Sequence, residues 1–177
     1  MYVGEIMIIK YDDLKEIRKN KRKIGVCTGC FDLLHTGHLC FFEEVKKHCD
    51  ILVVVVLDDS KIKEIKEDNR PIINQQDRIK LLDSLKVVDY VILADQESDV
   101  SDYQKYNFKE NETFFWKSYG RIFEDLRPDI LGVSNQHHIS EAMKIFFHEM
   151  NIEICTVNLL DNLSTTCIIN KIKKINI

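Results

Sequence analysis

The chain has 177 residues, of which 45% are hydrophobic and 31% are charged, a balance typical of a folded globular protein. Its 25 Lys and Arg residues against 29 Asp and Glu give a formal net charge of −4, which disfavours binding to nucleic acid or to an anionic membrane. The longest apolar run, Ile51 to Leu57, is far shorter than the roughly 20 residues that span a bilayer. Met1 to Lys10 does not resemble a secretion signal, so we expect a cytoplasmic protein with neither nucleic-acid nor membrane partners.

Strand-like and helix-like patterns alternate along the chain. In chain order the sequence predicts a strand at 24–30, a helix at 37–49, a strand at 51–57, a helix at 75–85, strands at 88–93 and 129–133, a helix at 140–150, a strand at 152–157 and a helix at 165–174. This alternation favours a single α/β domain over residues 24–177, a Rossmann-like three-layer sandwich with a mostly parallel sheet. Ligands of such sheets bind outside the carboxyl ends of the strands, here the Thr28–Phe31 region.

Two segments stand apart from this alternation. Residues 1–23 form a charged N-terminal arm, predicted to be helical from Tyr11 and explained either by a solvated face or by a contact with an anion or another subunit. Residues 95–120 carry seven aromatic side chains, which are consistent with a lid over a substrate, a dimer surface or simple packing.

Six cysteines lie within apolar, periodic segments. In a cytosolic protein these are expected to be reduced thiols of the interior rather than a disulfide framework. They are Cys27, Cys30, Cys40, Cys49, Cys155 and Cys167.

Two histidines follow the first predicted strand, in the string Gly29-Cys-Phe-Asp-Leu-Leu-His-Thr-Gly-His38. They occur where a helix should begin, and a helix N-terminus offers unpaired N–H groups and a positive dipole to a phosphate. Gly37 would allow a phosphate to approach the backbone closely. Two imidazoles can donate hydrogen bonds to phosphate oxygens as charge develops on them. The string therefore predicts a polyphosphate site, with structural histidines or a partial metal site as the alternative.

The residues Gly29-Cys-Phe-Asp32 and His35-Thr-Gly-His38 resemble the signature of the HxGH nucleotidyltransferase superfamily, which is cytidylyltransferase-like. Ser164-Thr-Thr-Cys-Ile-Ile169 resembles its second signature, found at a helix start. The resemblance covers about Gly25 to Lys173. Small members of this superfamily include glycerol-3-phosphate cytidylyltransferase, the phosphoethanolamine enzymes and the adenylyltransferase domain of ADP-heptose synthase.

The resemblance implies an attack on the α-phosphate of a nucleoside triphosphate by an oxygen of a phosphorylated small molecule, with release of pyrophosphate and no covalent enzyme intermediate. It implies Mg²⁺ carried by the substrate phosphates, no metal ligands from the protein, and a homodimer. His35, His38, Lys63 and Lys66 would be the catalytic residues. The nucleotide-binding residues would be Thr28, Gly29, Cys30, Phe31, Gly37, Arg78, Asn135, Ser164, Thr165 and Thr166.

Several of these residues also have ordinary structural explanations. Ser164 can cap a helix without a ligand, and Lys63 and Lys66 alternate with glutamates as on an exposed helix. Asp32 and Asp59 match acidic positions of the family, and Asp32 is expected to hold the motif loop rather than to act as a base.

The sequence defines the reaction better than it defines the nucleobase of the donor or the identity of the acceptor molecule. Asp161, three residues before Ser164, and Leu159, where cytidylyltransferases often carry arginine, favour adenylyl transfer to a sugar phosphate. The string Gly132-Val-Ser-Asn-Gln-His-His138 matches neither branch, so ATP and CTP both remain possible donors. The glycerol-3-phosphate type of cytidylyltransferase and a catalytically inactive nucleotide sensor are the alternatives. A redox or zinc protein built on Cys27-Thr-Gly-Cys30 is a further one.

Overall fold

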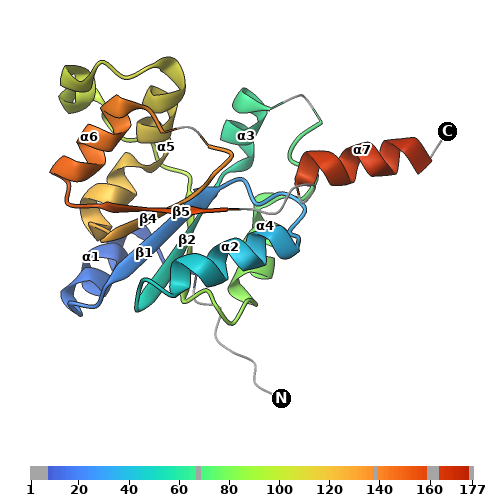
Figure 1. Cartoon of the computed structure of the whole chain (residues 1–177), viewed down its shortest axis with the longest axis horizontal. Helices are drawn as coiled ribbons and strands as arrows, with labels where there is room; N and C mark the ends of the chain where they lie inside the picture. The colour runs from blue at the N-terminus through green and yellow to red at the C-terminus, as the bar shows by residue number, and fades with distance from the viewer. Residues whose placement is uncertain (1–7, 67–68, 138, 159–163, 176–177) are drawn as a thin grey trace.

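The chain, seen as a computed structural model whose described residues are 8–66, 69–137, 139–158 and 164–175, is built around one parallel sheet (Figure 1). The strands follow one another across the sheet in the order β3-β2-β1-β4-β5. Their bounds are β1 (Ile24–Gly29), β2 (Ile51–Leu57), β3 (Tyr90–Ala94), β4 (Ile130–Ser134) and β5 (Glu153–Val157). All five predicted strands are present, which confirms the predicted α/β class.

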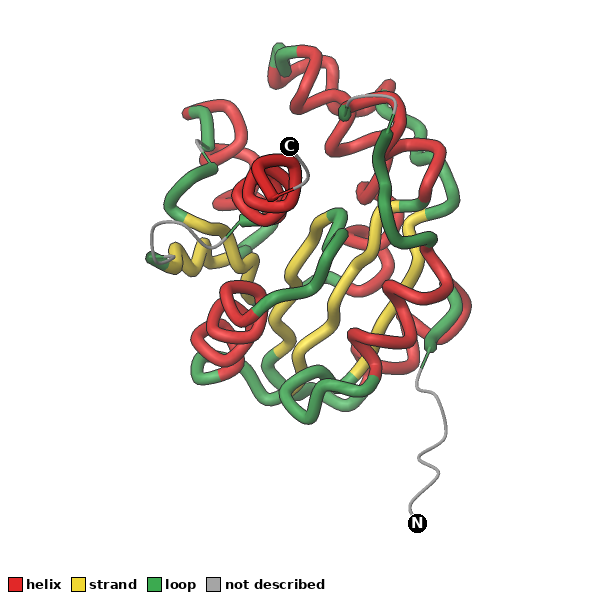
Figure 2. Tube along the Cα trace, turned by 90° about the vertical axis from the view of Figure 1, so that its right-hand side faces the viewer, coloured by secondary structure: helices red, strands yellow, loops and turns green. Residues whose placement is uncertain are grey.

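Helices cover both faces of this sheet (Figures 1 and 2). One face is covered by α1, α5 and α6, and the other by α2 and α4. No helix within the described ranges has both the length and the apolar character that a bilayer span requires. The helices are α1 (Tyr11–Lys19), α2 (Thr36–Lys46), α3 (Asp59–Ile65), α4 (Gln75–Asp83), the 3-10 helix η1 (Ser101–Tyr106), α5 (Glu110–Leu126), α6 (Glu141–Glu149) and α7 (Thr165–Ile175).

The run of β-branched residues in β2 shows why the sheet must be covered on both faces. Val53 and Val55 belong to the core cluster under α1, α5 and α6, whereas Val54 and Val56 belong to the cluster under α2 and α4. Every residue of β2 is buried. A parallel strand covered on both faces needs apolar residues at every position, which is the pattern of this run.

The position of β1 explains where a ligand can bind. From β1 the chain continues to β2 and β3 on one side and returns later to β4 and β5 on the other. The carboxyl ends of β1 and β4 therefore lie next to each other at the point where the strand order reverses. Parallel α/β sheets bind their ligands at such a reversal.

The charged N-terminal segment forms a helix with one apolar side. Tyr11, Leu14 and Ile17 of α1 are buried in the core. Arg18 of α1 donates to Asp129 at 2.7 Å, and Asp129 in turn accepts from the backbone N–H of Ile24 at the start of β1. Arg18 of the charged helix α1 thus helps to hold the start of β1 through Asp129.

The aromatic segment 95–120 packs within the protein. Trp116 of α5 is fully buried, and its ring centroid is 4.2 Å from that of Phe146 in α6. Phe108 and Tyr103 complete the cluster, each in ring contact with Trp116 and with Phe146. Of the three explanations for this segment, the structure supports packing.

A close contact at Gly132 sets the spacing between β4 and α2. A Cβ atom at this position would be 2.6 Å from a methyl carbon of Val45 and 2.9 Å from the sulfur of Cys27. Only a residue without a side chain lets α2 approach the sheet this closely.

We predict that Gly132→Ala lowers the free energy of unfolding by about 1–3 kcal/mol, because overpacking a rigid core forces neighbouring atoms to move. Chemical denaturation followed by circular dichroism measures this change. Gly120→Ala is the control for a milder contact, since its Cβ would lie 3.1 Å from the side chain of Ser98 and 3.6 Å from the ring of Trp116. A loss at Gly132 no larger than that at Gly120 would contradict the packing explanation.

Candidate active site

The two histidines lie at the N-terminus of α2, directly beyond the carboxyl end of β1. His35 is the N-cap residue, and its Nδ1 accepts a hydrogen bond from the backbone N–H of Gly37 at 3.1 Å. The Nδ1 of His38 accepts from the backbone N–H of His35 at 3.3 Å. The two ring centroids are 3.9 Å apart. Because each Nδ1 is an acceptor, each neutral imidazole carries its proton on Nε2, as a donor for a ligand.

Both imidazoles favour the neutral form. Burial lowers the pKa of His38 to about 4, and the neighbouring His35 contributes to the same shift. Burial also lowers the pKa of His35. At neutral pH the pair therefore presents two Nε2–H groups without positive charge.

Asp32 holds the motif loop in place, as the sequence predicts. Its Oδ1 accepts from the backbone N–H of Ile73, and its Oδ2 accepts from the backbone N–H of Ile72 and from Nε of Arg70 at 2.6 Å. Burial alone would raise the pKa of Asp32, but these three hydrogen bonds outweigh burial and hold its pKa below the usual value. Asp32 is thus an ionised structural residue and not a general base.

The second signature lies beside the first. Ser164 caps α7, since its Oγ accepts from the backbone N–H of Cys167 at 3.2 Å. Thr165 donates its hydroxyl to the backbone carbonyl of Asp32 at 2.5 Å. Thr166 is exposed in the first turn of the same helix. The structure therefore brings the histidine loop and the hydroxyl trio together, although 133 positions separate Asp32 from Thr165.

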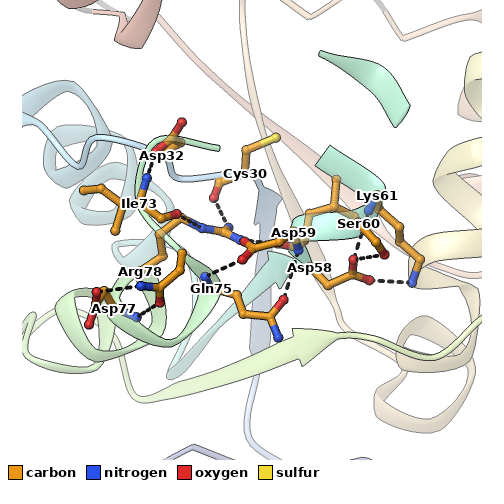
Figure 3. A network of polar contacts seen from close by, with 12 residues as sticks. Cys30, Asp32, Asp58, Asp59, Ser60, Lys61, Ile73, Gln75, Asp77 and Arg78 are labelled. Carbon is orange, nitrogen blue, oxygen red and sulfur yellow. Dashed lines mark hydrogen bonds and ion pairs between the residues drawn. The ribbon is translucent and has the colours of Figure 1, made fainter. Parts of the chain in front are cut away.

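The Arg78 side chain lies among Cys30, Asp59 and Ile73 (Figure 3). It is fully buried, and it donates to the carbonyls of Cys30, Leu57 and Ile73 and to Oδ1 of Asp59. The guanidinium thereby connects the ends of β1 and β2 to the loop before α4. These contacts give Arg78 a structural role, and its contact with a triphosphate stays a prediction.

The lysines of the candidate site belong to α3 and its end. Lys63 is exposed in the last turn, and Lys66 is the exposed C-cap residue. Burial raises the pKa of the Cys30 thiol, and the positive charge of Lys66 partly offsets this shift. Lys66 therefore acts electrostatically on the loop that carries the first signature.

A third lysine of α3 has a role that sequence analysis missed. Lys61 is buried, and its ammonium pairs with Asp58 at 3.2 Å (Figure 3). The same ammonium donates to the backbone carbonyl of Ala94 at 2.9 Å. Asp58 is the N-cap of α3, so an acidic cap three residues before a lysine is the signal that could have revealed the pair. The pair joins the end of β2 to the end of β3.

The remaining nucleotide-binding candidates frame the histidines. Thr28 and Gly29 end β1, and Gly37 is buried in the first turn of α2. Phe31 has a φ of 50° and contacts the His38 ring edge-on, at 5.6 Å between centroids. Asn135 follows β4 and donates its backbone N–H to Val157. Leu159, Asp161 and His138 lie outside the described residues.

The Cys27 and Cys30 thiols do not form an exposed pair. Cys27 is fully buried in β1, and burial raises its pKa well above the usual value. A raised pKa keeps the sulfur protonated, whereas metal binding and thiol exchange require the thiolate. The environment of Cys27 therefore disfavours the redox and zinc hypotheses.

We predict that His38 titrates in NMR spectra with a midpoint near 4 and carries its proton on Nε2 at pH 7, because burial penalises the imidazolium. The unfolded chain takes up this proton near the usual imidazole pKa of 6.5, whereas the folded chain takes it up near 4. The free energy of unfolding should therefore decrease as the pH falls from 6.5 toward 4. Loss of the signal in His38→Asn assigns the resonance. A midpoint at or above the usual imidazole value would contradict this prediction.

We predict that Arg78→Lys lowers the free energy of unfolding by about 2–4 kcal/mol. A lysine ammonium cannot replace the hydrogen bonds that the planar guanidinium donates to several buried acceptors. Arg22→Lys at an exposed position is the control. Unchanged stability together with a weaker affinity for nucleoside triphosphate would show instead that Arg78 acts mainly on the ligand.

Comparisons with known proteins bear on the family to which the chain belongs. The family model described as cytidylyltransferase-like matches residues 26–171. The bifunctional protein HldE of Campylobacter fetus subsp. fetus is 32% identical over 96% of this chain, and that of Helicobacter pylori strain J99 is 32% identical over 91%. These stretches cover 32% and 30% of the relatives, so the chain spans about a third of the length of the curated relatives it matches.

Solved structures share the fold. The lipopolysaccharide core biosynthesis protein of Thermoplasma volcanium is 29% identical with a TM-score of 0.57, over 79% of this chain and 99% of that one. The pantoate-beta-alanine ligase of Francisella tularensis is 16% identical with a TM-score of 0.54, over 98% of this chain and 79% of that one, and this likeness concerns the fold alone. With the family model covering most of its length, the chain belongs to the cytidylyltransferase-like family of nucleotidyltransferases.

Proposed function

We propose that this protein transfers a nucleotidyl group from a nucleoside triphosphate to a sugar phosphate and releases pyrophosphate. The contact between Thr165 and the backbone of Asp32 carries this proposal, because it brings the N-terminus of α7 to the loop that precedes the histidines. In this proposal the N-termini of α2 and α7 and the two Nε2–H donors bind one polyphosphate. The HldE relatives support the same class of reaction.

In the proposed reaction an oxygen of the acceptor phosphate forms a bond to the α-phosphorus of the triphosphate. The bond from that phosphorus to the oxygen bridging to the β-phosphate breaks, and pyrophosphate leaves with that oxygen. His35 and His38 donate from Nε2 to phosphate oxygens that gain negative charge. Because both Nδ1 atoms accept backbone hydrogen bonds, the two imidazoles act here as neutral Nε2–H donors rather than as imidazolium cations.

The other candidate residues position the two substrates. Lys63 and Lys66 bring mobile ammonium groups to the incoming phosphate and to the developing charge. Ser164, Thr165 and Thr166 would contact the β- and γ-phosphates from the N-terminus of α7. The end of β1, from Thr28 to Phe31, together with Gly37 and Asn135, would contact the rest of the nucleotide.

The donor set fits a magnesium ion carried by the substrate. Both carboxylate oxygens of Asp32 already accept hydrogen bonds, and Asp59 is paired with Arg78. Mg²⁺ bound to phosphate oxygens and water needs few protein ligands, and it would neutralise charge on the leaving pyrophosphate.

ATP is the preferred donor in this proposal, with CTP as the alternative. The preference depends on Asp161 and Leu159, and on similarity to HldE. A homodimer is expected from the family resemblance and stays a prediction.

We predict that the purified protein with Mg²⁺ releases pyrophosphate from one of ATP, CTP, GTP or UTP when a sugar phosphate is present. His38→Ala should lower kcat by about 10²–10⁴-fold, because a donor to the developing charge is lost, while thermal unfolding stays close to that of the wild type. His48→Ala, at an exposed position after α2, is the matched control.

An unchanged rate in His38→Ala would remove the catalytic assignment. Tight triphosphate binding without pyrophosphate release, for every acceptor tried, would favour the nucleotide sensor.

A further inference from the structure

A cavity of about 400 Å³ lies between α3 and the first half of α5, and none of the residues assigned to the proposed reaction lines it. Lys61 and Glu64 of α3 line this cavity, which we call the α3–α5 cavity. Lys63 lies two positions after Lys61, which places it about 200° further round the helix. The helix α3 therefore has the α3–α5 cavity on one side and a lysine of the candidate active site on the other.

The buried part of the cavity offers hydrogen-bond donors. Ser118 is 1% exposed, lines the cavity, and its hydroxyl has no hydrogen-bond partner among the described residues. Such a buried hydroxyl is unfavourable unless a further group pairs with it. Lys61 is 5% exposed, and its ammonium has three N–H groups for its contacts with Asp58 and Ala94. The Lys61 ammonium keeps one N–H group beyond these two contacts, and the Ser118 hydroxyl can donate to a ligand oxygen once its side chain rotates toward the cavity.

The rim of the cavity carries hydrogen-bond acceptors. Glu64, Glu97 and Glu110 are exposed carboxylates that can accept hydrogen bonds. With Lys61 and Lys117, the ionisable groups of the lining have a formal charge of −1. This charge disfavours a phosphate group as the occupant of the cavity.

Apolar surface completes the lining. The rings of Phe108 and Phe114 are half-buried at the cavity, and Thr113 adds a hydroxyl. Small-molecule sites combine apolar walls with a few convergent polar groups in this way.

We propose that the α3–α5 cavity binds the polyhydroxylated carbon skeleton of a sugar. Sugar hydroxyls accept from an ammonium or a hydroxyl and donate to carboxylates, so they match donors at the buried end and acceptors at the rim. The C–H face of a sugar ring matches the phenylalanine rings. The sugar has two possible sources: the acceptor of the proposed reaction, in which case this inference rests on the proposed function, or a free sugar that binds beside α3.

The test is a set of titrations of the ¹⁵N-labelled protein followed by NMR, with glucose, mannose, glucose 1-phosphate, mannose 1-phosphate and glycerol 3-phosphate as probes. We expect saturable shifts of amide signals in 113–118 and 61–64 with at least one sugar. Absence of shifts in both segments with all probes, or saturable shifts confined to other segments, overturns the proposal.

Ser118→Ala separates a ligand contact from a merely structural role. It should weaken sugar affinity about fivefold to tenfold, as expected for one lost hydrogen bond. It should also leave the ligand-free melting temperature unchanged or raised, because an unpaired buried hydroxyl is removed. Asn111→Ala, exposed on the same helix and outside the cavity, is the control. Unchanged affinity in Ser118→Ala overturns the proposal.

The same titrations identify the source of the sugar. Binding of glucose or mannose as tight as that of the 1-phosphates supports a free sugar, whereas preference for a 1-phosphate, strengthened by ATP and Mg²⁺, supports the acceptor. These measurements need no turnover, so the sugar site can be judged even if pyrophosphate release is not observed.

Discussion

The architecture of the site depends on the hydrogen bonds that converge on Asp32. Its side chain accepts from the backbone of Ile72 and Ile73 and from Arg70, and its backbone carbonyl accepts from Thr165. One residue thereby fixes the loop before α4 and the start of α7 relative to the histidine loop. An ionised carboxylate in a buried position is costly unless all of its acceptor capacity is used, and here hydrogen bonds reach both oxygens.

Arg78 is a buried cation whose charge, like that of the Asp32 anion, is compensated by several hydrogen bonds. The buried guanidinium is compensated by three carbonyls and one carboxylate, so its energetic value lies in the number of partners rather than in one ion pair. The carbonyls of Cys30 and Leu57, at the carboxyl ends of β1 and β2, find their hydrogen-bond donor in this buried side chain rather than in water. The protein uses a long, forked side chain to pair them, and this leaves the histidines and the exposed lysines for a ligand.

Much of this could be predicted from the sequence because the signals are local. The unbroken run Ile51–Leu57 indicates a strand covered on both faces, and the position of His35 and His38 between a strand and an apolar helix indicates a helix start. That the two imidazoles themselves cap this helix start was not predicted. The role of Asp32 also followed from its place in the motif. By contrast, the burial of Lys61 and Arg78 depends on partners 33 and 48 positions away, and no local pattern encodes such contacts. The packing of the aromatic segment depends on α6 in the same way.

The hydrogen bond from Thr165 to the carbonyl of Asp32 has a consequence for synthesis of the chain. The histidines and the whole β1–β2 pair are made early, but the hydroxyls opposite them belong to the last helix. A growing polypeptide released after β5 would contain all five strands of the sheet and would still lack the hydroxyl groups that we propose as triphosphate ligands. In the proposed function, a chain that ends before α7 should therefore bind a nucleoside triphosphate more weakly than a chain that contains α7.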